Sequence, residues 1–253
     1  MEGARWPRGA VTLPRVLNVM KLVSWNVAGR VKRLDAQVEF LAQMRPDLVA
    51  LQEVTKRTCS RLREGLSRLG LVHQADSIEL HPDELPAAGP RRYALLLASR
   101  YPLRLVHELH FDIPWPERIL ARSVNTSRRS FDWLTTYIPP GSTNGWIKVE
   151  VLEGLYSALA CPWPRSRILC GDFNTPREET GGGKTITFGD RRGDRWVRAE
   201  WNVLRGLADH GLPDVYRGIH GYGRLAYSWV LRRSDQSRLR RFDHVFAASS
   251  MKS

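Results

Sequence analysis

Short apolar runs and amphipathic stretches follow one another along the chain, and this pattern predicts a mixture of strands and helices. The apolar runs read as strands buried on both faces of a sheet, where the alternation of polar and apolar side chains is lost. Strands are predicted at residues 21–26, 48–53, 93–99, 119–124, 132–137, 167–172, 227–230 and 242–247. Helical spacing of apolar residues, such as Leu34, Val38 and Leu41 before Pro46, predicts helices. They cover residues 34–42, 62–69, 146–159 and 198–208.

The order of these elements predicts a fold of the α/β (α+β) class. Helices and strands alternate over much of the chain, but residues 93–137 are rich in strands, so antiparallel pairs are expected beside crossover units. A chain of 253 residues can bury a large core as one domain, which we expect at residues 20–253. Residues 1–19 are expected to form a disordered extension. No apolar stretch approaches the roughly 18 residues needed to cross a bilayer, so we expect no membrane insertion.

Polar side chains end three of the predicted strands. Asn26 follows one apolar run, Glu53 ends the next, and Gly171-Asp172-Phe173-Asn174 follows a third. Side chains two residues apart on an extended chain point to the same side, so Asp172 and Asn174 can act on one water and one phosphate. Ligands bind beyond the strand ends of such sheets, and carboxylates suit a hard cation such as magnesium. The alternative is an ordinary turn, since Gly, Asp and Asn are also turn residues.

Five short segments occur in the order seen in one superfamily. They are Ser24-Trp25-Asn26, Leu51-Gln52-Glu53, Tyr137-Ile138-Pro139-Pro140-Gly141, Gly171-Asp172-Phe173-Asn174 and Arg241-Phe242-Asp243. The chain resembles the endonuclease/exonuclease/phosphatase superfamily from about residue 20 onward. This resemblance implies a DNase I-like, four-layered sandwich of two mixed β-sheets flanked by helices. Tyr137 resembles the exonuclease III type, whereas many phosphatase-like members carry histidine there.

The resemblance also implies a role for each of these residues. The metal ligands would be Glu53 and Asn26, and the catalytic residues would be Asp172, Asn174, Tyr137 and Asp243. Asp172 would position or deprotonate the attacking water, and Asn174 and Tyr137 would contact the scissile phosphate. Asp243 would lie near the metal or orient the catalytic histidine of the family. The implied cofactor is Mg²⁺, with Mn²⁺ as a second possibility.

The chain departs from the family at its end, because the final Ser-Asp-His motif is absent before Ser253. We therefore expect a chain truncated before that motif, with the last strand or strands missing, lower stability and weak activity. His244 is not expected to replace the family histidine, since it follows Asp243 on a predicted strand and should point to the opposite face. A packed or surface position is the expected one.

The net charge of +13 favours a polyanionic partner such as nucleic acid. However, only six of the 39 basic residues are lysine, and a GC-rich genome would produce the same arginine bias. Candidate substrate-binding residues are Arg240, Arg241 and Trp229, although a solvated loop and a packed core aromatic would look alike. Three scattered cysteines suggest a reducing compartment, so a cytoplasmic location is expected. No obligate protein partner is evident.

These observations favour an enzyme, a magnesium-dependent hydrolase of phosphodiester bonds. The leading hypothesis is a nuclease that cleaves DNA by attack of water on the phosphate. A second hypothesis is a phosphatase or phosphodiesterase that uses the same site on a small phosphorylated molecule or a lipid headgroup. A third is a catalytically impaired fragment that binds nucleic acid.

Overall fold

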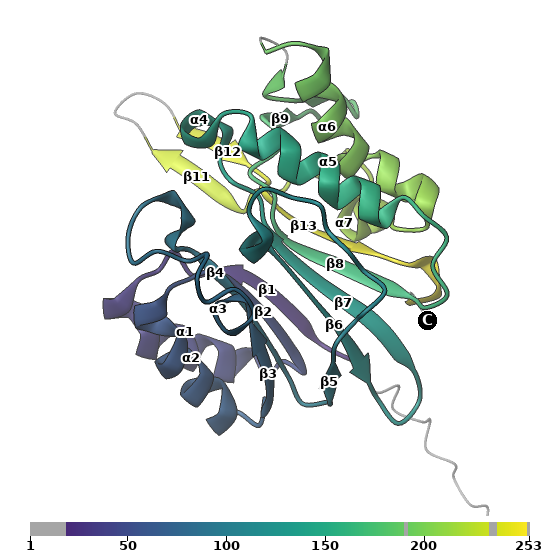
Figure 1. The fold of residues 1–253 in the computed structure, drawn as a ribbon. Helices are drawn as coiled ribbons and strands as arrows, with labels where there is room; N and C mark the ends of the chain where they lie inside the picture. Colours follow the sequence, from purple (N-terminus) through teal and green to yellow (C-terminus); the bar gives the residue numbers. More distant parts are fainter. Residues whose placement is uncertain (1–18, 190–191, 233–236, 252–253) are drawn as a thin grey trace, which may run out of the picture.

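Two mixed β-sheets pack face to face in the computed structural model, which describes residues 19–189, 192–232 and 237–251 (Figure 1). The first sheet has the order β1-β2-β4-β3 and contains β1 (Leu22–Asn26), β2 (Leu48–Val54), β3 (His73–Asp76) and β4 (Ala94–Ser99). The second has the order β13-β8-β7-β6-β5. Its strands are β5 (Leu103–Arg104), β6 (Ile119–Asn125), β7 (Ser130–Tyr137), β8 (Arg167–Asp172) and β13 (Asp243–Ala247). The pairs β1–β2 and β7–β8 are parallel and the other pairs are antiparallel.

Helices cover the outer faces of both sheets (Figure 1). The first sheet carries α1 (Leu34–Met44) and α2 (Lys56–Arg68), with the short α3 (Ser77–Leu80) after β3. The second carries α5 (Ile147–Leu159) and α6 (Asp194–Leu204), with α4 (Gly141–Asn144) before α5 and α7 (Val215–His220) next to β13. The predicted four-layered fold is therefore confirmed.

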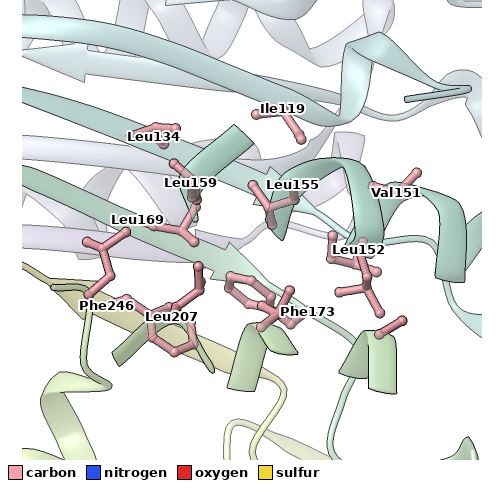
Figure 2. Packing of buried hydrophobic residues seen from close by; sticks show 14 of the residues in the cluster. Ile119, Leu134, Val151, Leu152, Leu155, Leu159, Leu169, Phe173, Leu207 and Phe246 are labelled. Atoms are coloured by element: carbon pink, nitrogen blue, oxygen red, sulfur yellow. The ribbon is translucent and has the colours of Figure 1, made fainter. Parts of the chain in front are cut away.

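Three apolar clusters hold these layers together, one under each helical layer and one between the sheets. Figure 2 shows the cluster in which Leu152 and Leu155 of α5 pack against Leu169 of β8. Phe173 belongs to the same cluster and is fully buried. The segment that carries Asp172 and Asn174 is thus anchored in the core by the residue between them, since successive side chains of an extended chain point to opposite sides.

Two small ribbons lie outside the sandwich. One pairs β9 (Glu178–Glu179) with β10 (Thr185–Ile186), and the other pairs β11 (Trp229–Arg232) with β12 (Ser237–Arg240). The sequence pattern missed β9, β10 and β12, together with β3 and β5, because each is short and carries polar residues. Trp229 lies directly opposite Arg240 in the second ribbon.

Among the described residues, β1 and β13 are end strands of their sheets. Residues 1–18 of the expected extension lie outside the described residues, and the missing last strand stays a prediction. No helix in the described ranges has the length and apolar character to span a membrane. Cys59, Cys161 and Cys170 are free thiols, and burial raises the pKa of Cys170 to about 11, which makes it an inert core residue.

Candidate active site

Four strand ends meet at one edge of the sandwich. The parallel strands β1 and β2 lead to Asn26 and Glu53, and the parallel strands β7 and β8 end at Tyr137 and Asp172, which are register partners. The amide nitrogen Nδ2 of Asn26 donates to Oε1 of Glu53 and to Oδ2 of Asp172, both at 2.8 Å. Its Oδ1 accepts the backbone N–H of Ala28 at 2.9 Å, which fixes the orientation of the amide. Residues 146 positions apart in sequence therefore share one polar cluster.

Two residues of this cluster have left-handed backbone conformations that are uncommon outside glycine. The φ of Glu53 is 56°, at a register shift of the β2–β4 pair between Leu51 and Val54, and the φ of Asn174 is 49°. Asn174 donates its backbone N–H to Oδ1 of Asp172 and its side-chain Nδ2 to the carbonyl of Ile138, both at 2.9 Å. Backbone strain of this kind is often retained at functional sites.

Gly171 permits the close packing of β8 against β7 beside the site. Its φ is +145°, and an added Cβ would lie 2.0 Å from the carbonyl oxygen of Thr136. A side chain at this position would push β8 away from β7 and displace Asp172, which follows directly.

The site concentrates negative charge in a buried place. Asp243 is the register partner of Asp172 on β13, and Oδ1 of Asp243 is buried without a hydrogen-bond partner among the described residues. Burial, followed by the charge of Asp243, raises the pKa of Asp172. Burial likewise raises the pKa of Asp243, against the hydrogen bond from Ser228. The carboxyl groups of Asp172 and Asp243 face each other across a strand pair and are largely removed from water, so they are stabilised either by sharing a proton or by a cation.

The donor set fits a hard, hydrated cation. Oε1 of Glu53 and Oδ2 of Asp172 each lie 2.8 Å from Nδ2 of Asn26. The two carboxylates are therefore close enough for one ion with its water shell to bridge them. Within the described ranges, no three His, Cys, Asp or Glu side chains close around one point as in a fully protein-ligated site. Magnesium is typically held by one or two carboxylates together with water and substrate phosphate, so Glu53 and Asp172 suit it. Asn26 turns its donor nitrogen Nδ2 toward both carboxylates and so orients them, and its predicted role as a metal ligand stays a prediction.

Tyr137 lies beside Asp172 and Glu53 as a buried, neutral phenol. It is 5% exposed, and burial, then the charges of Glu53 and Asp172, raise its pKa. A tyrosine in this state donates a hydrogen bond at neutral pH. The guanidinium of Arg118 lies 4.8 Å from the centroid of its ring, and the ring of Tyr93 meets it edge-on at 5.9 Å.

A cavity of about 260 Å³ opens beside Asn174 and has aromatic walls. Its lining includes Asn174, Lys148, Phe188, Arg192, Trp196, Trp229, Arg240 and Phe242; we call it the aromatic pocket. The guanidinium of Arg240 lies 5.0 Å from the ring of Phe188 and 5.5 Å from that of Trp229. The predicted substrate-binding residues Trp229 and Arg240 thus lie next to the predicted phosphate-binding Asn174, and their roles stay predictions.

The structure contradicts the predicted role of Arg241. Its guanidinium is buried and forms ion pairs with Glu179 at 2.8 Å and with Asp214 at 2.8 Å. These contacts use Nε and Nη2 of the guanidinium, and the two carboxylates balance its charge. His244 is also buried: Nδ1 contacts Oδ2 of Asp214 at 3.2 Å and Nε2 donates to the carbonyl of Thr175 at 2.9 Å. It is packed, as expected, and points away from Asp172.

Three buried charged residues at the site were missed by the sequence pattern, namely Arg118, Lys148 and Glu200. A signal existed for the last two. Lys148 lies on the same helical face as Val151 and Leu152, and Glu200 lies on that of Trp196 and Val203. A single charge on an apolar helical face indicates a buried charge, although it does not identify the partner.

The sequence of this chain matches a known protein family over most of its length. The model of the Endonuclease/Exonuclease/phosphatase family matches residues 23–252. The chain belongs to this family. The resemblance drawn from the five short segments is therefore confirmed, while a search of curated proteins finds no match.

Solved structures of this family share the fold. An AP endonuclease from Archaeoglobus fulgidus superposes with a TM-score of 0.68 at 21% identity, over 92% of this chain and 88% of the other. A humanized D. rerio TDP2 gives 0.62 at 18% identity, with 92% and 85% covered. The 3′ phosphatase NExo from Neisseria, bound to a product DNA hairpin, gives 0.60 at 20% identity, with 92% and 88% covered. At these identities the likeness establishes the fold.

Proposed function

We propose that this protein is a divalent-metal-dependent hydrolase that cleaves phosphodiester bonds in DNA by attack of water. The observation that carries the proposal is the Asn26 amide nitrogen, which joins the carboxylates of Glu53 and Asp172 at the mouth of the sandwich. The membership of the family supports a phosphoester hydrolase. The names of the similar structures, an AP endonuclease and a 3′ phosphatase bound to a DNA product, support DNA as the substrate.

The side chains divide the chemistry among them. Glu53, with Asp172 beside it, would hold a magnesium ion, which when bound would neutralise charge on the phosphate and acidify a bound water. Asn26 orients these two carboxylates through its Nδ2. Asp172 accepts the proton of the attacking water. Asn174 uses one amide hydrogen on Ile138 and has the other for a phosphate oxygen. Tyr137 donates its phenol hydrogen to the same group.

The surroundings of the site support a nucleic-acid substrate. Aromatic walls next to the scissile position can stack against a base or sugar, and Arg240 and Arg192 can neutralise flanking phosphates. The net charge of +13 adds a general attraction that salt would weaken. A small phosphorylated molecule would need neither of these features.

The proposal is tested with the full chain on abasic duplex DNA, intact duplex, single strands and inositol phosphates, with magnesium and with EDTA. The variants are Glu53→Gln and, as a matched control, Glu64→Gln, whose carboxylate is 71% exposed. We expect magnesium-dependent DNA cleavage that falls by roughly 10²- to 10⁴-fold in Glu53→Gln and is unchanged in the control. Turnover confined to inositol phosphates would replace the proposal with the small-molecule phosphatase. DNA binding without magnesium-dependent turnover would identify a binding protein.

A further inference from the structure

A buried ion pair connects the loop of Asn174 to the wall of the aromatic pocket. Lys148 of α5 is 1% exposed, and its Nζ donates to the backbone carbonyl of Asn174 at 2.9 Å. The same ammonium is ion-paired with Oε1 of Glu200 on α6, which is fully buried. The ion pair therefore contacts the active-site loop directly through one of its two members.

The other end of the pair holds the pocket wall. Oε2 of Glu200 accepts the backbone N–H of Phe188 at 2.7 Å, and Nζ of Lys148 lies 4.9 Å from the centroid of the Phe188 ring. Phe188 and Lys148 both line the aromatic pocket, as does Asn174. One pair of charges thus fixes the backbone of Asn174 and the backbone of Phe188, a residue of the pocket wall, relative to each other.

Stability alone does not explain this arrangement. Removing two charges from water is unfavourable, and well-packed apolar residues of similar volume often give equal or greater stability. Burial lowers the pKa of Lys148, against the attraction of Glu200. In return, the ammonium fixes the carbonyl of Asn174, a residue with the uncommon φ of 49° whose side chain must point toward the phosphate.

We infer that Lys148 and Glu200 are positioning residues that hold Asn174 in register with Asp172 and with the aromatic pocket. This inference rests on the proposed function for its catalytic consequence, but its structural part does not. Without the pair, the loop at Asn174 moves more freely, and a displacement of about 1 Å can reduce the rate roughly 10²-fold.

The first experiment measures the loop without any substrate. Lys148→Met/Glu200→Leu replaces the pair by apolar side chains and keeps the core filled. A matched control, Arg165→Met/Asp132→Leu, removes the ion pair between Arg165 and the buried Asp132, which lies at the other end of β7 from Tyr137. We expect amide exchange of the 172–175 peptide to rise about tenfold or more in the first variant and to stay unchanged in the control. Unchanged exchange in the first variant would overturn the inference.

The second experiment asks whether the pair acts through Asn174. In the wild-type background, Lys148→Met/Glu200→Leu is expected to lower kcat roughly 10- to 100-fold. In an Asn174→Ala background the same change should have little further effect, whereas a general loss of structure would multiply the two losses. Multiplied losses would overturn the inference. If the double variant does not fold, Glu200→Gln is measured in its place, with a smaller effect in the same direction expected.

The two proposals fail in different ways. Hydrolysis that does not depend on Glu53 would contradict the proposed function, and the exchange measurement would still decide the role of Lys148. Normal hydrolysis with unchanged loop exchange in the Lys148→Met/Glu200→Leu variant would contradict only the positioning role.

Discussion

Replacement of Glu179, which lies in an ion-pair network next to the active site, by glutamine should lower the free energy of unfolding by an amount that depends on pH in the acid range. The carboxylate of Glu179 is 8% exposed and accepts hydrogen bonds from Arg217 at 2.7 and 3.3 Å and from Arg241 at 2.8 and 2.9 Å. Burial would raise its pKa, but these two guanidinium groups outweigh burial and lower it from 4.5 to about 2. Arg241 lies two residues before Asp243, so this network also anchors the strand that enters the site.

The magnitude follows from the displacement of the pKa. At about 1.4 kcal/mol per pH unit, a fall from 4.5 to about 2 corresponds to about 3 kcal/mol of stability. Because the pKa is lower in the folded protein, this contribution is complete above pH 4.5 and is lost as the pH falls toward 2. Glu179→Gln has no such carboxylate, so its stability should lack this part of the acid dependence.

The assay is urea unfolding between pH 7 and pH 2.5, followed by tryptophan fluorescence. We expect Glu179→Gln to be less stable than the wild type by about 3 kcal/mol at pH 7, and the difference to shrink steadily below pH 4.5. The control is Glu153→Gln. Glu153 also pairs with an arginine, Arg195, through two contacts, but the two side chains are 37% and 52% exposed, respectively. This control should change the free energy of unfolding by less than about 1 kcal/mol. A difference between wild type and Glu179→Gln that is constant with pH would refute the reasoning.

Three further predictions concern the site itself. Gly171→Ala should lower the free energy of unfolding by roughly 3–5 kcal/mol in urea titrations, because the new Cβ would meet the Thr136 carbonyl; an unchanged value would show that β8 can move aside. Asp243→Asn should raise the melting temperature in EDTA while lowering kcat. Because folding raises the pKa of Asp243, the gain in stability should grow as the pH rises above 4, and a gain independent of pH would contradict this. Magnesium should raise the melting temperature of the wild type and not that of Glu53→Gln, as measured by calorimetry; equal shifts would exclude Glu53 as a ligand.

The strand ends were predictable from sequence because burial and polarity change there within one or two residues. Asp172 and Asn174 point toward the site and Phe173 toward the core, as the twofold alternation of an extended chain requires. The convergence of Glu53 with Asp172 was predictable from the tendency of polar strand ends to gather at one edge of a sheet. Their shared contact with Asn26 required the coordinates.

The arginine cluster before Asp243 shows where sequence reasoning stops. Arg240 and Arg241 are neighbours, so alternation places them on opposite sides of the strand, but it does not say which side faces the site. The structure directs Arg240 to the aromatic pocket and Arg241 to Glu179 and Asp214, two carboxylates from distant segments. A buried ion pair depends on both partners, and only one of them is local in sequence.

The distance between Glu53 and Asp172 depends on how the two sheets dock, because one residue lies on each. Gln52 immediately precedes Glu53, is fully buried, and donates to Oγ1 of Thr135 on β7 at 2.9 Å. The apolar side chains around it would pack acceptably in more than one docking of the sheets, but a buried amide is satisfied only where it meets its partner. Thr135 lies two residues before Tyr137 on the same face of β7. The docking that gives Nε2 of Gln52 this partner is therefore the one that brings Glu53 over Tyr137 and Asp172. The same contact thus contributes both to the specificity of the sheet interface and to the geometry of the site.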